Sequence, residues 1–219
     1  MTDSDCSGCT AQISAIACGT VPSPAGWWKF DDGGGTAAAD SSGKGYPGTL
    51  VNGPAWVAGR AGGALSFSGN AMVTLPSALP LAPLWTIGAW FLYPLPNTGG
   101  WHTLTRGTTD HQILVNPDQV SLGSFDNAGG TGFRDSGFRM NTLTPGWHHV
   151  AAVGSGGRTA FYMDGRAVGA IPWQSTNNVY AIGNFQLGGQ PFGTLSDVRV
   201  YATALTAAQV GAIADGTAP

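Results

Sequence analysis

The sequence contains no glutamate: all 12 acidic residues are aspartate, and charged residues of both signs make up only 10% of the 219 residues. A catalytic mechanism that uses a pair of glutamates is therefore excluded. The nine basic residues stand singly along the chain. Because nucleic acids are bound by clustered basic faces, we expect no nucleic-acid partner.

Long unbroken hydrophobic runs are also missing. The most apolar stretch, residues 79–95, is interrupted by Pro80, Pro83 and Pro94, which would break a membrane-spanning helix. The N-terminus has aspartates where a secretory signal needs positive charge, and no long apolar stretch follows. We expect no membrane span. An extracellular or virion-surface location is expected. Either the sequence is a mature or recombinant piece, or the protein leaves its cell by another route, for example inside a virion released by lysis.

Cysteine is confined to the first 18 residues, as Cys6, Cys9 and Cys18, so the rest of the chain must fold without disulfides. The CxxC spacing is a weak signal for zinc, and a disulfide, an intermolecular link or free thiols are the alternatives. Residues 1–25 combine a polar opening, a short apolar stretch and two prolines. They are predicted to form an anchor, docking or disordered arm, followed by one domain over residues 26–219.

Glycine (35 residues), proline (14) and apolar residues (42%) are abundant, which is typical of a β protein rich in turns. From Trp27 onward, about a dozen short β-favouring runs alternate with turn residues, as expected of a sandwich or barrel. Asp164-Gly165 predicts a type I′ hairpin turn. One short helix is expected at 205–214, with Thr206 as its N-cap and Gly216 at its end.

Several motifs occur in an order that resembles the laminin-G-like, concanavalin A-like lectin/glucanase superfamily, from about residue 26 to residue 215. They are WWKFDDGGGTAAADSSGKGYPGTL, AWVAGRAGGALSFSG, LWTIGAWF, WHHVAAVGSGGRTAFYMDGRAVG, IGNFQLGG and GTLSDVRVYATALTAAQV. The resemblance implies an all-β fold: a two-sheet antiparallel jelly-roll β-sandwich with a short C-terminal helical turn.

The same resemblance implies a structural calcium ion surrounded by Asp40, a carbonyl near Gly45 and Asp197, since loop oxygens suit this hard cation. Two positions depart from the family pattern: Tyr46 stands where Asn is common, and Ser196 where a further Asp often occurs. The alternative is that Asp40 organises an Asx turn and that Asp197 pairs with Arg199 or a backbone amide.

Catalysis is not expected. Some members of the superfamily are glycoside hydrolases that use two glutamates in an ExDxxE-type strand, and this chain has none. No GxSxG nucleophile motif occurs either. The adjacent His148 and His149 point to opposite faces of a strand, so they are not expected to chelate one ion. A glycoside hydrolase remains a remote alternative.

A non-catalytic carbohydrate-binding or adhesive module is the preferred function, with a glycan or cell-surface polysaccharide as its partner. Sugars are bound by aromatic faces together with planar polar groups. The candidate ligand-binding residues are Trp101, His102, Arg106, Arg134, Trp173, Asn177, Tyr180 and Phe192. The alternative is a structural virion component, such as a bacteriophage decoration, fibre or tail-associated protein, that docks onto capsid or tail proteins through residues 1–25.

The tryptophans are expected to divide between core and surface. Trp101 and Trp173 follow turn-like segments and are predicted to be exposed. Trp27, Trp85, Trp90 and Trp147 lie in strand motifs and are predicted to be buried in the sandwich.

Overall fold

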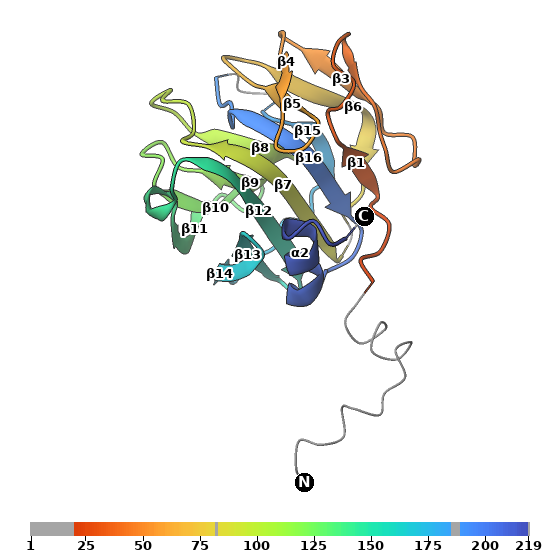
Figure 1. Ribbon diagram of the computed structural model, residues 1–219. Helices are drawn as coiled ribbons and strands as arrows, with labels where there is room; N and C mark the ends of the chain where they lie inside the picture. The colour runs from red at the N-terminus through yellow and green to blue at the C-terminus, as the bar shows by residue number, and fades with distance from the viewer. Residues whose placement is uncertain (1–19, 82, 185–188, 219) are drawn as a thin grey trace.

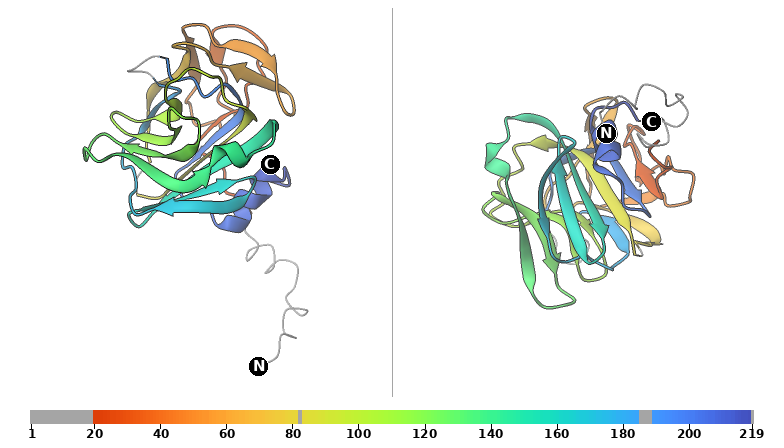
Figure 2. Two further views of the ribbon diagram at one scale, coloured as in Figure 1. Left: turned by 90° about the vertical axis from the view of Figure 1, so that its left-hand side faces the viewer. Right: turned by 90° about the horizontal axis from the view of Figure 1, so that it is seen from below.

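The computed structural model describes residues 20–81, 83–184 and 189–218. They form two antiparallel β-sheets packed face to face, with one short α-helix near the C-terminus (Figure 1). The view from below shows the strands of the two sheets in separate layers (Figure 2). This architecture confirms the predicted all-β, two-sheet jelly-roll sandwich. No helix in the described ranges is long and apolar enough to cross a membrane.

The first sheet contains, in spatial order, β14 (Arg166–Ile171), β13 (Arg158–Met163), β12 (Gly146–Ser155), β7 (Trp85–Tyr93), β16 (Thr194–Tyr201), β5 (Gly63–Ser66) and β4 (Ala55–Ala58), and β1 (Gly26–Trp28) pairs with β16. The second sheet contains, in spatial order, β11 (Gly132–Arg139), β10 (Ser121–Asp126), β9 (His111–Val115), β8 (His102–Arg106), β15 (Val179–Ile182), β6 (Met72–Leu79), β3 (Gly48–Val51) and β2 (Ala37–Ala38). A 3₁₀ turn, η1 (Met140–Thr142), follows β11.

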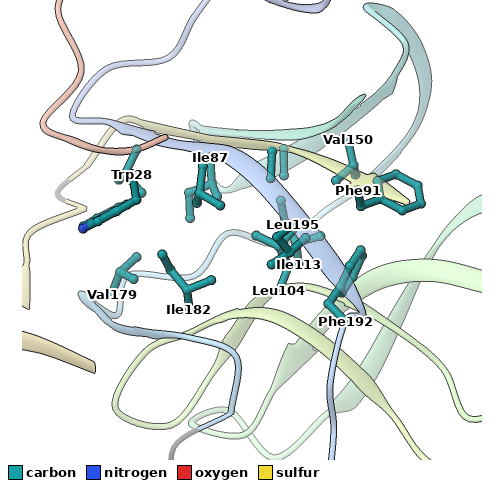
Figure 3. Packing of buried hydrophobic residues seen from close by; sticks show 14 of the residues in the cluster. Trp28, Ile87, Phe91, Leu104, Ile113, Val150, Val179, Ile182, Phe192 and Leu195 are labelled. Atoms are coloured by element: carbon teal, nitrogen blue, oxygen red, sulfur yellow. The ribbon is translucent and has the colours of Figure 1, made fainter. Parts of the chain in front are cut away.

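The main hydrophobic core lies between the sheets (Figure 3). Alternation along β7 directs Ile87 and Phe91 inward, where Phe91 makes an edge contact with Phe192 at 5.5 Å between ring centroids. Leu104 and Ile113 face them from the second sheet and have no exposed surface. Full burial of such a side chain stabilises the fold by about 1.5–3 kcal/mol.

Two local predictions are confirmed. Asp164 and Gly165 have φ values of 49° and 75°, as a type I′ turn between β13 and β14 requires. The helix α2 (Ala207–Ala214) begins with a capping box between Thr206 and Gln209. The backbone of these segments follows from their own residues, so the sequence was sufficient to place them.

Helix α2 packs on the outer face of the first sheet in a second apolar cluster, with Val210 and Ile213 against Tyr201. Val21 packs against the same cluster, and the Ala25 N–H donates a 2.7 Å hydrogen bond to the carbonyl of residue 200. The described residues Val21 and Ala25 of the predicted arm thus contact the domain, and the division after residue 25 stays a prediction. The remainder of that arm, with its three cysteines, lies outside the described residues.

A β-bulge in β16 sets the side chains on the outer face of the first sheet. Ser196 pairs with Trp90, but Arg199, three residues on, pairs with Gly88, only two residues away on β7. Asp197, inside this shift, has a φ of 54°. Because the bulge adds one residue, Ser196 and Arg199 lie on the same face, which simple alternation would not allow.

Candidate functional site

A shallow pocket of about 90 Å³ lies on the outer face of the second sheet. We name it the aromatic pocket, and it is lined by Trp101, His111, Leu114, Phe125, Asn127 and Gln190. Strand register explains why residues far apart in the sequence meet there. Phe125 pairs with Phe133 on one side and with His111 on the other, so their side chains share one face.

Trp101 stands at the centre of the aromatic groups. Its indole lies 5.2 Å from the Phe125 ring and 5.3 Å from the Phe133 ring, measured between centroids. The packing depends on Gly123, because a side chain there would bring a Cβ within 2.8 Å of the Phe133 ring. The indole of Trp101 is only half-buried, so part of its surface faces solvent.

A ring of hydrogen-bonded side chains holds the polar wall of the aromatic pocket. Arg106 Nη1 lies 2.8 Å from His111 Nε2 and donates to Asn184 Oδ1 at 3.0 Å. Gln190 Oε1 accepts hydrogen bonds from Asn184 Nδ2 at 2.7 Å and from Thr103 Oγ1 at 2.8 Å. His111 Nδ1 lies 2.9 Å from Thr103 Oγ1 and closes the ring.

This ring determines the protonation of His111. A guanidinium can only donate, so Nε2 accepts from Arg106 and the imidazole proton lies on Nδ1. Burial, together with the positive charge of Arg106, lowers the pKa of His111 to about 3. His111 is therefore neutral at physiological pH and acts as a fixed part of the wall.

The position of Asn127 on the rim depends on Asp110, which is 2% exposed. Asp110 Oδ1 accepts hydrogen bonds from the backbone N–H groups of Asn127 at 3.1 Å and Ala128 at 2.9 Å. The Asp110 backbone is in turn fixed by Asn177, whose Oδ1 accepts from the N–H groups of Thr109 at 2.8 Å and Asp110 at 2.9 Å. Asn177, predicted as a ligand-binding residue, therefore has a supporting position.

Three other predicted ligand-binding residues are buried. His102 has no exposed surface and Phe192 is 1% exposed, so in this structure neither side chain reaches the surface where a ligand would bind. His102 Nδ1 lies 2.8 Å from the Pro191 carbonyl, and burial lowers the pKa of its imidazole. Arg106 is 3% exposed and belongs to the hydrogen-bonded ring.

Arg134, Trp173 and Tyr180 are the remaining predicted ligand-binding residues, and none of them lines the aromatic pocket. Arg134 forms an ion pair with Asp126 at 2.7 Å and lies over the Trp173 ring at 5.4 Å. Trp173 is half-buried against the main core, and Tyr180, on β15, is 39% exposed. Of the eight predicted residues, only Trp101 lines the aromatic pocket.

No local pattern in the sequence distinguishes His111, Leu114, Phe125 or Gln190 as ligand-binding residues. Apolar alternation around Phe125 marks it as a strand residue, but nothing local shows which strand pairs with it. The tryptophan predictions were correct for Trp85 and Trp90, which are 0% and 8% exposed. They were wrong for Trp27 and Trp147, which are only half-buried.

The loop after Asp40 matches the Asx-turn alternative. The Asp40 carboxylate accepts backbone hydrogen bonds from Trp27 at 3.1 Å, Ser42 at 2.9 Å and Tyr46 at 3.0 Å. Burial raises the pKa of Asp40, but hydrogen bonds from Ser42, Tyr46 and Trp27 outweigh it, so the pKa is lowered overall. Gly45 has a φ of 86° and lies in the exposed turn.

Asp197 matches the other alternative, an ion pair with Arg199 at 3.0 Å. Asp197 also accepts the indole N–H of Trp27, and Arg60 lines the same pocket. No three His, Cys or Asp side chains in the part of the chain described gather closely enough to hold a metal ion. A calcium ion needs free oxygen donors. These residues do not fit the implied site, because backbone N–H groups already surround the Asp40 carboxylate and Arg199 and the Trp27 indole already bind the Asp197 carboxylate.

Melting the protein in EDTA and in millimolar calcium tests this conclusion. We expect the two midpoints to agree, because an ion that does not bind the native state cannot raise its melting temperature. Magnesium at the same concentration controls for ionic strength. A calcium-specific rise of several degrees, removed by Asp197→Asn, would show that Asp40 and Asp197 rearrange to hold the ion.

Comparison with solved structures supports the fold. Domain 4 of AbnA, a GH43 extracellular arabinanase from Geobacillus stearothermophilus in complex with arabinotriose, aligns with a TM-score of 0.62 and 20% identity over 87% of this chain and 98% of that chain. A sialidase from Trypanosoma rangeli aligns with a TM-score of 0.62 and 14% identity over 89% of this chain, but over only 33% of the sialidase.

The binding domain of botulinum neurotoxin DC, in complex with rat synaptotagmin II, aligns with a TM-score of 0.62 and 15% identity over 89% of this chain and 51% of that chain. No sequence among the curated proteins matches significantly. The laminin G profile described as the concanavalin A-like lectin/glucanases superfamily matches residues 67–211, more than half of the chain. Together with the two-sheet sandwich, this match shows that the chain belongs to the concanavalin A-like lectin/glucanase superfamily.

Proposed function

We propose that this chain is a non-catalytic module that binds a glycan at the aromatic pocket. The observation that carries the proposal is the half-buried indole of Trp101, which lies beside the side-chain amides of Asn127 and Gln190 in one pocket. An indole offers an apolar surface to a sugar ring, and planar amides offer donors and acceptors to its hydroxyls. This is the combination expected of a carbohydrate site.

The wall of the aromatic pocket is preorganised, which favours binding of a small polar ligand. Arg106, His111 and Gln190 are held in the hydrogen-bonded ring through Thr103 and Asn184, so they lose little conformational freedom when a ligand arrives. The structural relative from Geobacillus stearothermophilus was solved with arabinotriose. That complex supports a saccharide as the class of ligand for this fold.

The proposal that the module is non-catalytic rests on its acids. The sequence has no glutamate, and the two buried aspartates beside the aromatic pocket already have partners. Asp126 forms an ion pair with Arg134, and Asp110 accepts backbone hydrogen bonds. The hydrogen bond from Arg134 lowers the pKa of Asp126 despite its burial, so this carboxylate is ionised and is not suited to be a general acid.

A glycan array followed by calorimetry tests the proposal. We expect Trp101→Ala to weaken the best array ligand by up to about tenfold, because an aromatic contact contributes up to ~1.5 kcal/mol. Trp147→Ala removes another half-buried indole and serves as the matched control. The proposal fails if the array retains no glycan, or if Trp101→Ala binds as tightly as Trp147→Ala.

The virion alternative and the location remain predictions. Docking onto capsid or tail proteins was assigned to residues 1–25, of which residues 1–19 lie outside the described ranges. Co-sedimentation of the full chain with particles, compared with a chain lacking residues 1–19, would test it.

A further inference from the structure

A second and larger pocket, of about 240 Å³, lies on the outer face of the first sheet. The aromatic pocket lies on the outer face of the second sheet, so the two pockets occupy opposite sides of the sandwich. We name the larger one the cationic pocket. Its lining includes Trp27, Lys29, Arg60, Trp90, Asp197 and Arg199.

The cationic pocket is assembled by strand pairing. Trp27 on β1 pairs with Arg199 on β16, which pairs with Gly88 on β7, and all three positions face outward. In the next row, Ser196 pairs with Trp90. The bulge at Asp197 places both rows on the same face, and Arg60 reaches them from the turn between β4 and β5.

The indole faces in the cationic pocket hold cations. Lys29 Nζ and the Arg199 guanidinium carbon each lie 4.3 Å from the centroid of the Trp27 ring. The Arg60 guanidinium carbon lies 3.8 Å from the centroid of the Trp90 ring. A cation over an indole face is attracted by the ring quadrupole. The rings are therefore occupied, so this pocket is not built for a sugar ring that stacks on tryptophan.

The charges of the cationic pocket do not cancel. Arg199 pairs with Asp197 through two hydrogen bonds of 3.0 and 3.1 Å, so this pair is neutral overall. Lys29 and Arg60 have no ion pair with any described carboxylate. Asp31 is the other acid of the lining, and one of its oxygens accepts a 2.6 Å hydrogen bond from the Gly63 N–H. The lining therefore has an excess of one positive charge.

A rigid base supports Arg60. Trp90 lies edge-on to His149, with 5.4 Å between ring centroids, and His149 is 2% exposed. The His149 ring in turn packs over Gly88, which has no side chain: a Cβ there would lie only 3.2 Å from His149 Nε2. Arg60, Trp90 and His149 thus form a stack that extends from solvent to the sheet and limits how the Arg60 side chain can move.

We propose that the cationic pocket is a second ligand site, which binds the oxyanion of a small organic acid, such as the carboxylate of an acidic sugar. Lys29 and Arg60 provide the charge from two separate segments, and the indoles keep both cations in place. The volume is below the roughly 300–1,000 Å³ of drug-sized sites, which suits a ligand of about one sugar ring. The proposal is independent of glycan binding at the aromatic pocket.

A titration with sodium D-glucuronate, monitored by the NMR signals of the tryptophan indole N–H groups, tests this site. We expect saturable shifts at Trp27 and Trp90 and none at Trp101, with affinity falling as salt rises because the contact is ionic. Methyl β-D-glucoside, which has the ring without the acid, is expected to give no shifts at these positions. Equal responses to glucuronate and glucoside would overturn the proposal.

Substitutions complete the test. Lys29→Gln with Arg60→Gln is expected to weaken glucuronate at least tenfold, whereas Arg158→Gln, which removes an exposed arginine elsewhere, is expected to have no effect. Thermal melting verifies that the double variant is folded. Unchanged binding in the folded double variant contradicts the proposal. If it unfolds, salt-insensitive glucuronate binding by the wild type contradicts it instead.

Two further comparisons distinguish the kind of oxyanion that binds and the pocket that binds it. Sodium sulfate that matches glucuronate in affinity would identify the ligand as any small oxyanion, and weaker sulfate binding would identify a carboxylate carried on a ring. Trp101→Ala is expected to bind glucuronate normally. A result that contradicts glycan binding at the aromatic pocket is therefore distinguishable from one that contradicts oxyanion binding at the cationic pocket.

Discussion

Lowering the pH from 7 to 5 is expected to reduce the free energy of unfolding by at least about 4 kcal/mol, with about 2 kcal/mol from each of His111 and His149 and a further loss from His102, whose pKa burial also lowers. Burial, as the largest cause, lowers the pKa of His111 to about 3 and that of His149 to about 4, from an ordinary value of 6.5. The unfolded chain therefore binds more protons than the native state in this range. The contribution of each neutral imidazole to the free energy of unfolding is fully present above pH 6.5. It is lost as the pH falls toward 4 for His149 and toward 3 for His111.

Denaturant unfolding at pH 7, 6 and 5 measures this loss. Aspartates do not contribute in this range, because their ordinary value of 3.8 lies below it. His149→Gln is the informative variant: it is less stable at pH 7, since a buried ring is lost, but its loss of stability between pH 7 and pH 5 is expected to be about 2 kcal/mol smaller than that of the wild type. A stability that is equal at pH 7 and pH 5 would show that neither imidazole is excluded from protonation in the native state.

Asp110→Ala is expected to destabilise the fold by about 3 kcal/mol and also to weaken glycan binding. The buried carboxylate accepts hydrogen bonds from the N–H groups of Asn127 and Ala128 through Oδ1 and from the Ser175 hydroxyl through Oδ2. Without it the two backbone donors lose their acceptor, and the buried Ser175 hydroxyl is left unsatisfied, which costs about 1–3 kcal/mol. The loop that carries Asn127 is then no longer held at the rim of the aromatic pocket.

Asp110→Asn is the matched control for this prediction. Its amide oxygen can still accept from the two backbone N–H groups, and the Ser175 hydroxyl can accept from its amide nitrogen. We expect a loss below about 1.5 kcal/mol and nearly normal glycan affinity, measured by urea unfolding and calorimetry. Equal effects of the two substitutions would show that the hydrogen bonds of Asp110 do not hold the loop.

Structural hydrogen bonds and burial explain why several of the predicted ligand-binding residues do not line the aromatic pocket. Asn177 was predicted as a polar residue near aromatic ones, but its amide oxygen is used to fix residues 109 and 110. His102 and Phe192 have equally suitable chemistry, yet they are buried. The chemical type of a residue was visible in the sequence, whereas its accessibility depended on segments that pack against it from elsewhere.

Strand pairing determined the composition of both pockets. Phe125 faces His111 across β10 and β9, and Arg60 covers Trp90 from another part of the first sheet. The pairing of distant strands is not encoded in any one segment, so period-2 alternation cannot reveal it. The bulge at Asp197 adds a further change, because it reverses the alternation within β16 and places Arg199 beside Trp27.

By itself the sequence determined the all-β class, the type I′ turn at Asp164-Gly165 and the capped helix after Thr206. These features depend on local backbone preferences, which neighbouring residues specify directly. Only the tertiary structure decided which side chains meet Trp101 and which cations gather over Trp27 and Trp90. The physical reason is that register, bulges and burial arise from contacts between strands that are distant in the chain.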